Sequence, residues 1–298
     1  MKPRDLALAV AVAAAWGFNF VVIDVGLDRL PPLLFSALRF GLAAFPAVLI
    51  VGRPRVAWRW VLAVGVVLGV VKFSLLFAGM DAGMPAGLSS LVLQAQAIFT
   101  LGFAVLLLRE RPGRRQLVGV GLAALGIALV AWRIGPGRPA GAFALVIGAA
   151  VAWGLSNVAM RRASPPDMLR FMVWISAVAA PVLAVLSLLV EGPAADLAAL
   201  RAFDLTTAAA LGYVTGVSTL LGFGAWGALI RRYGASTVAP FSMLVPFFGM
   251  ASAALLLDEA IHPSDVLGGA LVIGGVLLGA VRPSRVASPA PAVAAAIR

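Results

Sequence analysis

The sequence contains no cysteine and only one histidine, His262, in 298 residues. The absence of cysteine excludes disulfide bonds and thiolate metal sites, and a single histidine excludes a cluster of histidine ligands. The sequence also lacks a compact set of nucleophile, base and acid, and it has no phosphate-binding loop. We therefore expect no metal, no cofactor and no catalytic residues, and we disfavour a membrane enzyme.

Charge is scarce as well: 12% of the residues are charged, while 62% are hydrophobic and the mean hydropathy is +1.04. A soluble globule of this size needs far more polar surface than these residues provide. The hydrophobic runs have about 17 to 25 residues each, the length at which a helix crosses a hydrocarbon core of about 30 Å. Alternating barrel strands are absent. The sequence predicts an all-α integral membrane protein in a lipid bilayer.

Clusters of charged residues, proline and glycine divide the chain into ten predicted transmembrane helices. The run after Lys2 and Arg4 resembles a signal peptide, but it lacks a cleavage site and more helices follow, so we interpret it as the first membrane helix. The Ala/Pro-rich residues 284–298 are expected to form a disordered cytoplasmic tail. The expected spans are 6–24, 33–51, 60–80, 85–108, 115–133, 140–160, 168–190, 206–230, 235–257 and 264–281.

The basic residues are distributed unevenly among the loops between these spans. Of the 23 lysines and arginines, 17 fall on the side of the two termini and four on the opposite side, while Arg39 and Lys72 lie inside spans. Basic loops stay in the cytoplasm, so both termini are expected there, in the inner membrane of a bacterium. The formal charge of +11 does not indicate nucleic-acid binding, because the arginines form short clusters between apolar runs.

The chain contains an internal duplication. Trp-Gly occurs at 16–17 and again at 153–154, and Leu-Arg-Phe occurs at 38–40 and at 169–171. "LLLRERPGRRQLVGVGLAALG" (106–126) aligns with "LLLDEAIHPSDVLGGALVIGG" (255–275) at an offset of 149 residues. The predicted repeats are 1–135 and 136–283, with five spans each. Because five is odd, the second repeat enters the membrane from the opposite side, and such inverted repeats place a substrate site near the midplane where they meet.

The order of these motifs resembles the EamA-type members of the drug/metabolite transporter superfamily. Each half opens with a small-residue helix carrying Trp-Gly, has Leu-Arg-Phe in its second helix, and ends with leucines, a glutamate and a glycine-spaced helix. The resemblance covers residues 6–281 and is greatest for bacterial amino-acid exporters, including the YddG-type exporters of aromatic amino acids. One difference concerns the fourth helix of each half, because Pro246 has the counterpart Ala97, flanked by Gln94 and Gln96.

Four residues in the first helices of the two halves are candidates for the wall of a solute path. Trp16 and Trp153 fall about 15 to 20 Å into their helices, away from the interface that tryptophan prefers. Asn19 and Asn157 share a helix face with these indoles, and an amide that faced lipid would be costly. The alternatives are structural: an indole N–H bonded to a neighbouring helix, and amides that join helices.

Lys72 is the clearest candidate for a substrate-binding residue. It lies about 18 Å from the start of its span, on a face made otherwise of glycines, and no acidic residue is expected at that depth. Burial of a lysine is costly unless a partner compensates its charge, so we expect Lys72 to bind an anionic group such as a substrate carboxylate. Alternatively, backbone carbonyls cap the ammonium or the side chain snorkels outward. Arg39, closer to its helix end, is expected to be structural.

Polar residues of the fourth and ninth helices complete the predicted site. Gln94 and Gln96 point about 200° apart on a helix, so only one of them can face a cavity. We favour the face that carries Ser90 and Gln94. We add Ser242 to the predicted site, because Ser242 lies one turn before Pro246. A proline inside a helix leaves a backbone carbonyl without its hydrogen bond.

The sequence therefore predicts a monomeric exporter of amino acids, aromatic or hydrophobic ones in particular, or of similar small metabolites, that works by alternating access. The alternatives are an exporter or exchanger of another small anionic metabolite or drug and, in a different class, a membrane enzyme or a channel. A cation multidrug antiporter is disfavoured, because that chemistry requires a deep carboxylate.

Overall fold

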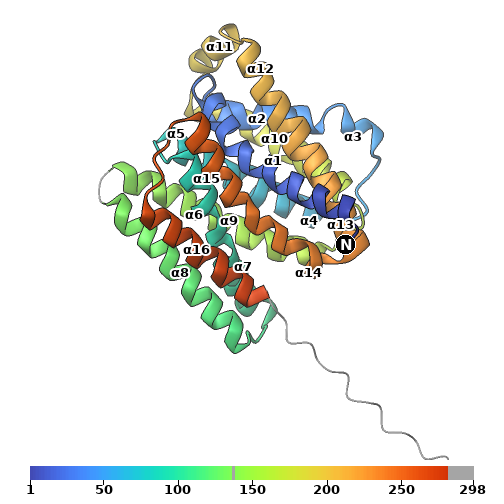
Figure 1. Cartoon of the computed structure of the whole chain (residues 1–298). Coiled ribbons are helices and arrows are strands. Elements are labelled where there is room, and N and C mark those ends of the chain that lie inside the picture. Colours follow the sequence, from blue (N-terminus) through green and yellow to red (C-terminus); the bar gives the residue numbers. More distant parts are fainter. Residues whose placement is uncertain (136–137, 281–298) are drawn as a thin grey trace, which may run out of the picture.

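The computed structural model describes residues 1–135 and 138–280, and its regular elements in this part of the chain are all helices (Figure 1). The apolar helix Pro263–Ala280, with 18 residues, corresponds to the predicted tenth span. Its apolar stretch, Pro263–Gly279, is shorter than the nine segments given below. The predicted end of that span at residue 281 and the predicted tail 284–298 lie outside the described residues. Among the described residues, nine helical segments are long and apolar enough to cross a membrane: Pro3–Leu27, Pro32–Ile50, Trp58–Asp81, Ala86–Leu108, Arg114–Ile134, Ala140–Ala163, Met168–Val190, Leu205–Tyr233 and Ala239–Leu256.

Several of these segments are built from shorter elements. The first half contains α1 (Pro3–Leu27), α2 (Pro32–Ala44), α3 (Ala47–Ile50), α4 (Trp58–Val64), the π-helical η1 (Gly65–Lys72), α5 (Phe73–Asp81), α6 (Ala86–Val92), the 3-10 turn η2 (Leu93–Ala95), α7 (Gln96–Leu108) and α8 (Arg114–Ile134). The second half contains α9 (Arg138–Ala163), α10 (Met168–Val190), α11 (Pro193–Arg201), α12 (Leu205–Gly212), the π-helical η3 (Tyr213–Leu221), α13 (Gly222–Tyr233), α14 (Ala235–Val238), the 3-10 helix η4 (Ala239–Leu244), α15 (Val245–Leu256) and α16 (Pro263–Ala280).

The two halves depart from regular α-helix at corresponding places. A π-helical stretch interrupts the third span of each half, at η1 and at η3, and a 3-10 stretch interrupts the fourth, at η2 and at η4. The fourth spans also end alike, because Arg109 after α7 and Asp258 after α15 both adopt the left-handed conformation, with φ of 54° and 53°. Arg109 and Asp258 are 149 residues apart, which is the offset of the sequence repeat. The backbone irregularities therefore recur with the duplicated sequence.

Helix starts follow local sequence. Proline in the first turn begins α1, α2 and α11, where its missing N–H has no helical partner in any case. Asp167 caps α10 and Asp204 caps α12 by accepting the backbone N–H of Arg170 at 3.1 Å and of Thr207 at 2.8 Å. The hydrogen bonds from Thr207 also hold the pKa of the exposed Asp204 carboxyl below its usual value. Such capping fixes where these spans begin.

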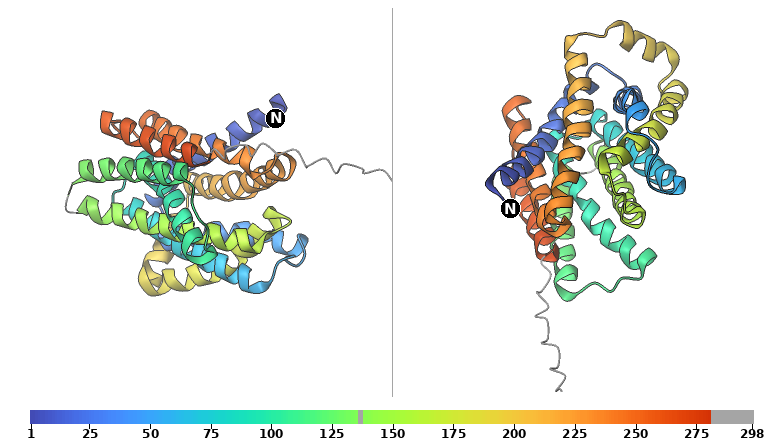
Figure 2. Two further views of the ribbon diagram at one scale, coloured as in Figure 1. Left: turned by 90° about the horizontal axis from the view of Figure 1, so that it is seen from below. Right: turned by 90° about the vertical axis from the view of Figure 1, so that its right-hand side faces the viewer.

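Helices α8 and α16 pack antiparallel through glycines. Gly119 meets Gly275, and Gly126 meets Gly268. A Cβ atom at Gly119, Gly126 or Gly275 would collide with a main-chain oxygen of the partner helix. Figures 1 and 2 show the two helices side by side along one edge of the bundle. Close approach through small residues is a common way for helices to associate in a membrane.

Two glutamates of the second half cap helices of the first half. Glu259 accepts the N–H groups of Ala86 and Gly87 at 2.6 and 3.0 Å, where α6 begins. Glu191 accepts those of residues 33 and 34, in the first turn of α2, at the same two distances. Burial raises the pKa of the Glu259 carboxyl, although the two backbone donors act in the opposite direction. Both glutamates supply acceptors for helix N-termini and join the halves at one end of the bundle.

Candidate functional site

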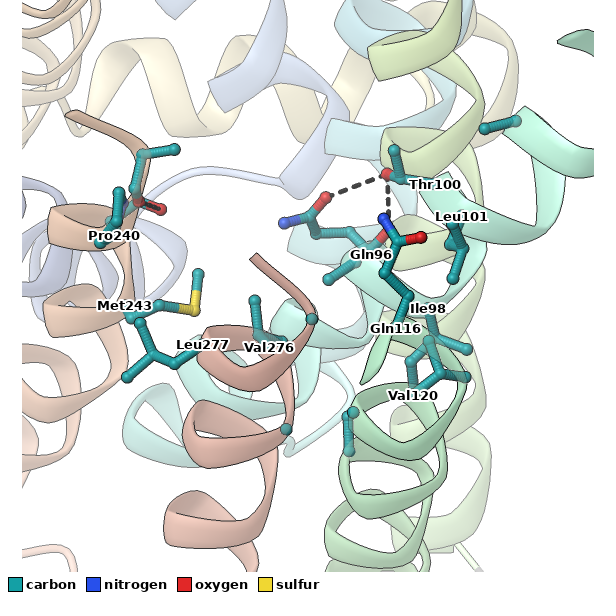
Figure 3. A pocket seen from close by; sticks show the side chains of 18 of the residues that line it. Gln96, Ile98, Thr100, Leu101, Gln116, Val120, Pro240, Met243, Val276 and Leu277 are labelled. Carbon is teal, nitrogen blue, oxygen red and sulfur yellow. Dashed lines mark hydrogen bonds between the residues drawn. The ribbon is translucent and has the colours of Figure 1, made fainter. Parts of the chain in front are cut away.

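A cavity of about 360 Å³ lies between α7, α8 and α9 on one side and η4 and α16 on the other (Figure 3). Its wall is largely apolar, with residues such as Leu101, Val120 and Met243. Sites for small molecules usually have volumes of about 300 to 1,000 Å³. The cavity is therefore at the small end of that range, which suits a solute of amino-acid size better than a large drug.

Three side chains form a polar network at the wall of this cavity. Asn157 of α9 donates from Nδ2 to Gln96 Oε1 at 2.7 Å and to Thr100 Oγ1 at 3.1 Å. Thr100 Oγ1 donates in turn to the main-chain oxygen of Gln96 at 2.7 Å. Gln96 and Thr100 line the cavity, and Figure 3 shows the Gln96 side chain reaching into it. Because Oε1 of Gln96 accepts from Asn157, its Nε2 remains as a donor to a solute carbonyl or carboxylate.

The cavity extends from this network to a solvent-exposed end of the bundle. Glu110 and Arg161 line it there and form an ion pair with side-chain exposures of 42% and 53%. Gln96 and Leu108, at the two ends of α7, are separated by about 18 Å, since a helix rises about 1.5 Å per residue. The network therefore lies about 18 Å from the Leu108 end of α7, which is more than half of the roughly 30 Å thickness of a hydrocarbon core.

Two buried cations lie next to one phenylalanine ring, outside the cavity wall. Lys72, 6% exposed, has its Nζ 3.5 Å from the centre of the Phe73 ring and 5.1 Å from that of Trp153. Arg39, 2% exposed, has its guanidinium carbon 4.2 Å from the same Phe73 ring, and its Nε and Nη2 donate to Thr219 Oγ1 at 3.3 and 3.0 Å. The ion pairs within residues 1–135 and 138–280 include neither cation.

The two Trp-Gly motifs lie at matching helix crossings. Gly17 lets α1 approach α15, because a Cβ there would come within 2.6 Å of Phe248 Cβ. Gly154 does the same for α9 and α7, with Phe99 Cβ at 2.8 Å. The Trp16 indole donates to the main-chain oxygen of Ser218 at 2.9 Å, which is the structural alternative that the sequence left open. Trp153, by contrast, contacts Lys72 and lies one turn from the amide network.

The remaining predicted site residues do not all meet at the cavity. Ser242 lines it, and its main-chain oxygen accepts from Gln94 Nε2 at 3.4 Å. Gln94 itself is buried and outside the wall, so the structure differs from the sequence in placing Gln96 there. Ser90 donates to the main-chain oxygen of residue 87 and packs against α15 at Gly249. Asn19 is 7% exposed, and its Oδ1 accepts no hydrogen bond within the described chain.

Sequence analysis did not select Gln96 or Thr100, which both line the cavity. The spacing of Gln96 and Thr100, four residues apart, was a usable signal, because it puts an amide and a hydroxyl on one helix face. The position of Arg39 near a helix end does not indicate its burial. The residues that bury it, Phe73 and Thr219, come from other spans.

Comparison with known proteins decides the family. The profile of the EamA-like transporter family matches this chain twice, over residues 5–132 and 140–280. The chain belongs to the EamA-like transporter family. Each matched range falls within one of the two predicted repeats.

Individual relatives are similar to this EamA-like transporter along most of its length. It is 40% identical to a probable amino-acid metabolite efflux pump of Salmonella typhimurium, over 93% of this chain and 95% of the relative. It is 39% identical, over the same shares, to the Escherichia coli protein of the same name. A probable terminal-alkyne amino-acid exporter of Streptantibioticus cattleyicolor is 28% identical, over 90% and 91%. A crystal structure with 18% identity superposes with a TM-score of 0.63, over 94% and 98%, and shows the same fold.

Proposed function

We propose that this EamA-like transporter exports amino acids, aromatic or hydrophobic ones in particular, or similar small metabolites from the cytoplasm across a bacterial inner membrane. The observation that carries the proposal is the free amide donor of Gln96 at the inner end of a cavity of amino-acid size. The apolar wall suits a hydrophobic side chain, and the donor suits the carboxylate or carbonyl end of the solute. The names of three curated relatives give the same substrate class.

Lys72 is proposed to bind the substrate carboxylate beyond the amide network. Trp153 lies one turn from Asn157 on α9, and the Lys72 ammonium lies 5.1 Å from the Trp153 ring. The cavity, the amide network and the ammonium thus follow one another along α9. A solute that moves past Gln96 toward the opposite side of the membrane would meet a cation there. Within the described chain, no side-chain acceptor or ion pair neutralises that cation.

The proposed architecture has ten membrane helices in two inverted five-helix repeats, 1–135 and 136–283. Its support is the glycine packing of α8 and α16. The repeat offset pairs Gly119 with Gly268 and Gly126 with Gly275 in sequence, while the contacts join Gly119 to Gly275 and Gly126 to Gly268. Exchange of the two halves therefore maps one contact onto the other. An axis in the membrane plane, which makes equivalent helices antiparallel, produces that relationship.

In the proposed orientation both termini lie in the cytoplasm, and the chain acts as a monomer. The 17-to-4 distribution of basic residues supports this orientation. The cavity end with Glu110 and Arg161 then opens to the cytoplasm. The opposite end is joined across the halves by the cap that Glu259 forms and by the Arg133–Asp265 pair at 2.7 Å. Release of substrate to the outside requires these contacts to separate while the cytoplasmic end closes.

Transport into proteoliposomes tests the proposed function. The purified protein is supplied with a panel of labelled amino acids, with and without a proton gradient. We expect saturable uptake of a subset of amino acids, with apolar side chains preferred, and lower uptake by Gln96→Leu. Protein-free liposomes are the background control. Unsaturable flux of all small solutes would indicate a channel and would contradict the proposal.

A further inference from the structure

Arg39 is buried and retains its charge. A guanidinium stays protonated in proteins, so burial cannot neutralise Arg39 by removing a proton. The side chain is 2% exposed, and two of its nitrogens share the single oxygen of Thr219. Its third nitrogen, Nη1, is buried without a hydrogen-bond acceptor among the described residues. The charge thus has no acidic partner among the described residues, and the N–H groups of Nη1 have no acceptor there.

Lys72 places a second cation at the same ring. Lys72 Nζ lies 3.5 Å from the Phe73 ring centre and the guanidinium carbon of Arg39 lies 4.2 Å from it. The two charged groups are therefore at most 7.7 Å apart. The face of an aromatic ring attracts cations, but one ring does not cancel the repulsion of two. The four ion pairs of the described chain all lie elsewhere. A small anion that touches both groups would offset the repulsion and satisfy the free donor of Arg39.

The paired charge is a feature of one half of the chain only. At the repeat offset of 149 residues, the counterpart of Lys72 is the exposed Leu221; Lys72 is the last residue of η1 and Leu221 is the last residue of η3. Arg170, the sequence counterpart of Arg39, lies in the first turn of α10. The helix packing of the repeat therefore does not itself require a cation at the position of Lys72. Binding of an anionic ligand would explain why Arg39 and Lys72 are buried together.

We infer that Arg39 and Lys72 form a binding site for one compact monovalent anion beside Phe73, occupied by chloride when no substrate is bound. Phe73 lies against both cations, Thr219 accepts from Arg39 and Trp153 lies near Lys72. The two cations are only 2% and 6% exposed, so only a compact anion would fit beside them. A solute carboxylate has the same chemistry and would displace the chloride. That displacement rests on the proposed function, whereas chloride binding does not.

Iodide quenching of tryptophan fluorescence tests the site in the full chain, reconstituted in nanodiscs at constant ionic strength with gluconate as the other anion. Iodide at the site would lie next to Trp153. We expect one saturable quenching component, absent in Trp153→Phe and shifted to higher iodide concentration by chloride. Arg39→Gln and Lys72→Gln should each weaken iodide binding at least tenfold. Arg39→Lys keeps the charge and should retain measurable binding.

Arg59→Gln is the matched control, because Arg59 also lies over an aromatic ring, Trp60 at 5.6 Å, but is exposed. Its saturable component should equal that of the wild type. Absence of saturable quenching in the wild type, or its persistence in both glutamine variants, would overturn the inference. Competition by formate without competition by chloride would also overturn it, because the site would then select carboxylates. Saturable chloride-sensitive quenching in a protein that transports no amino acid would support this site and contradict only the proposed function.

Discussion

Gly119 of α8 faces Gly275 of α16 so closely that a side chain on either residue would collide with the main-chain oxygen of the other. Two turns away, Gly126 and Gly268 form the corresponding contact. The four glycines recur at the repeat offset, so each half of the sequence supplies the same pair of glycines to this interface. Because the residue numbers rise along one helix as they fall along the other, the two helices are antiparallel.

We predict that Gly119→Ala lowers the thermal stability of the purified protein. The added methyl group must separate α8 from α16, and overpacking of this kind costs about 1 to 3 kcal/mol. Gly121→Ala is the control on the same helix, since a Cβ at Gly121 has no neighbour within 4 Å. It should leave the melting temperature unchanged or raise it slightly, because alanine favours helix. Equal melting temperatures for the two variants, measured in the same detergent, would contradict the packing.

A second prediction concerns the amide network. Asn157→Leu removes the donor that holds Gln96 Oε1, so Gln96 should lose its orientation toward the cavity. An unsatisfied buried acceptor costs about 1 to 3 kcal/mol, so we expect the kcat/KM of amino-acid transport to fall about fivefold or more. Ser90→Ala, outside the cavity, should have little effect. The double variant Asn157→Leu/Gln96→Leu should be no worse than Gln96→Leu alone. Additive losses would show that the two amides act independently.

A third prediction concerns orientation, and the absence of native cysteine makes it easy to test. Single cysteines replace two exposed arginines, Arg55 and Arg201, in loops predicted on opposite sides of the membrane. A membrane-impermeant maleimide added to intact cells should label Arg201→Cys and should reach Arg55→Cys only after the cells are opened. Labelling of Arg55→Cys in intact cells would reverse the proposed orientation.

The sequence predicted the parts of this structure that depend on local pattern. Hydrophobic length predicted the spans, and the duplicated Trp-Gly motif lies at matching helix crossings, which Gly17 and Gly154 make. The depth of Lys72 in its span predicted its burial. These properties follow from residue type and from position along a single helix.

The sequence did not predict properties that depend on how helices face one another. Helical periodicity separates Gln94 from Gln96, but it does not say which face meets the cavity, and η2 changes the turn between them. Ser90 packs on Gly249 because α6 crosses α15 there. Arg39 is buried by Thr219, which is 180 residues away in sequence. Such contacts are set by tertiary packing.

The most direct test of the proposed mechanism compares transport of a free amino acid with transport of its uncharged amide by wild type and by Lys72→Ala. If Lys72 binds the carboxylate, the variant should insert normally, lose at least tenfold in kcat/KM for the acid, and lose much less for the amide, which lacks the charge that lysine binds. Equal losses for both substrates, or no loss for either, in a variant that folds and inserts like the wild type would contradict the account.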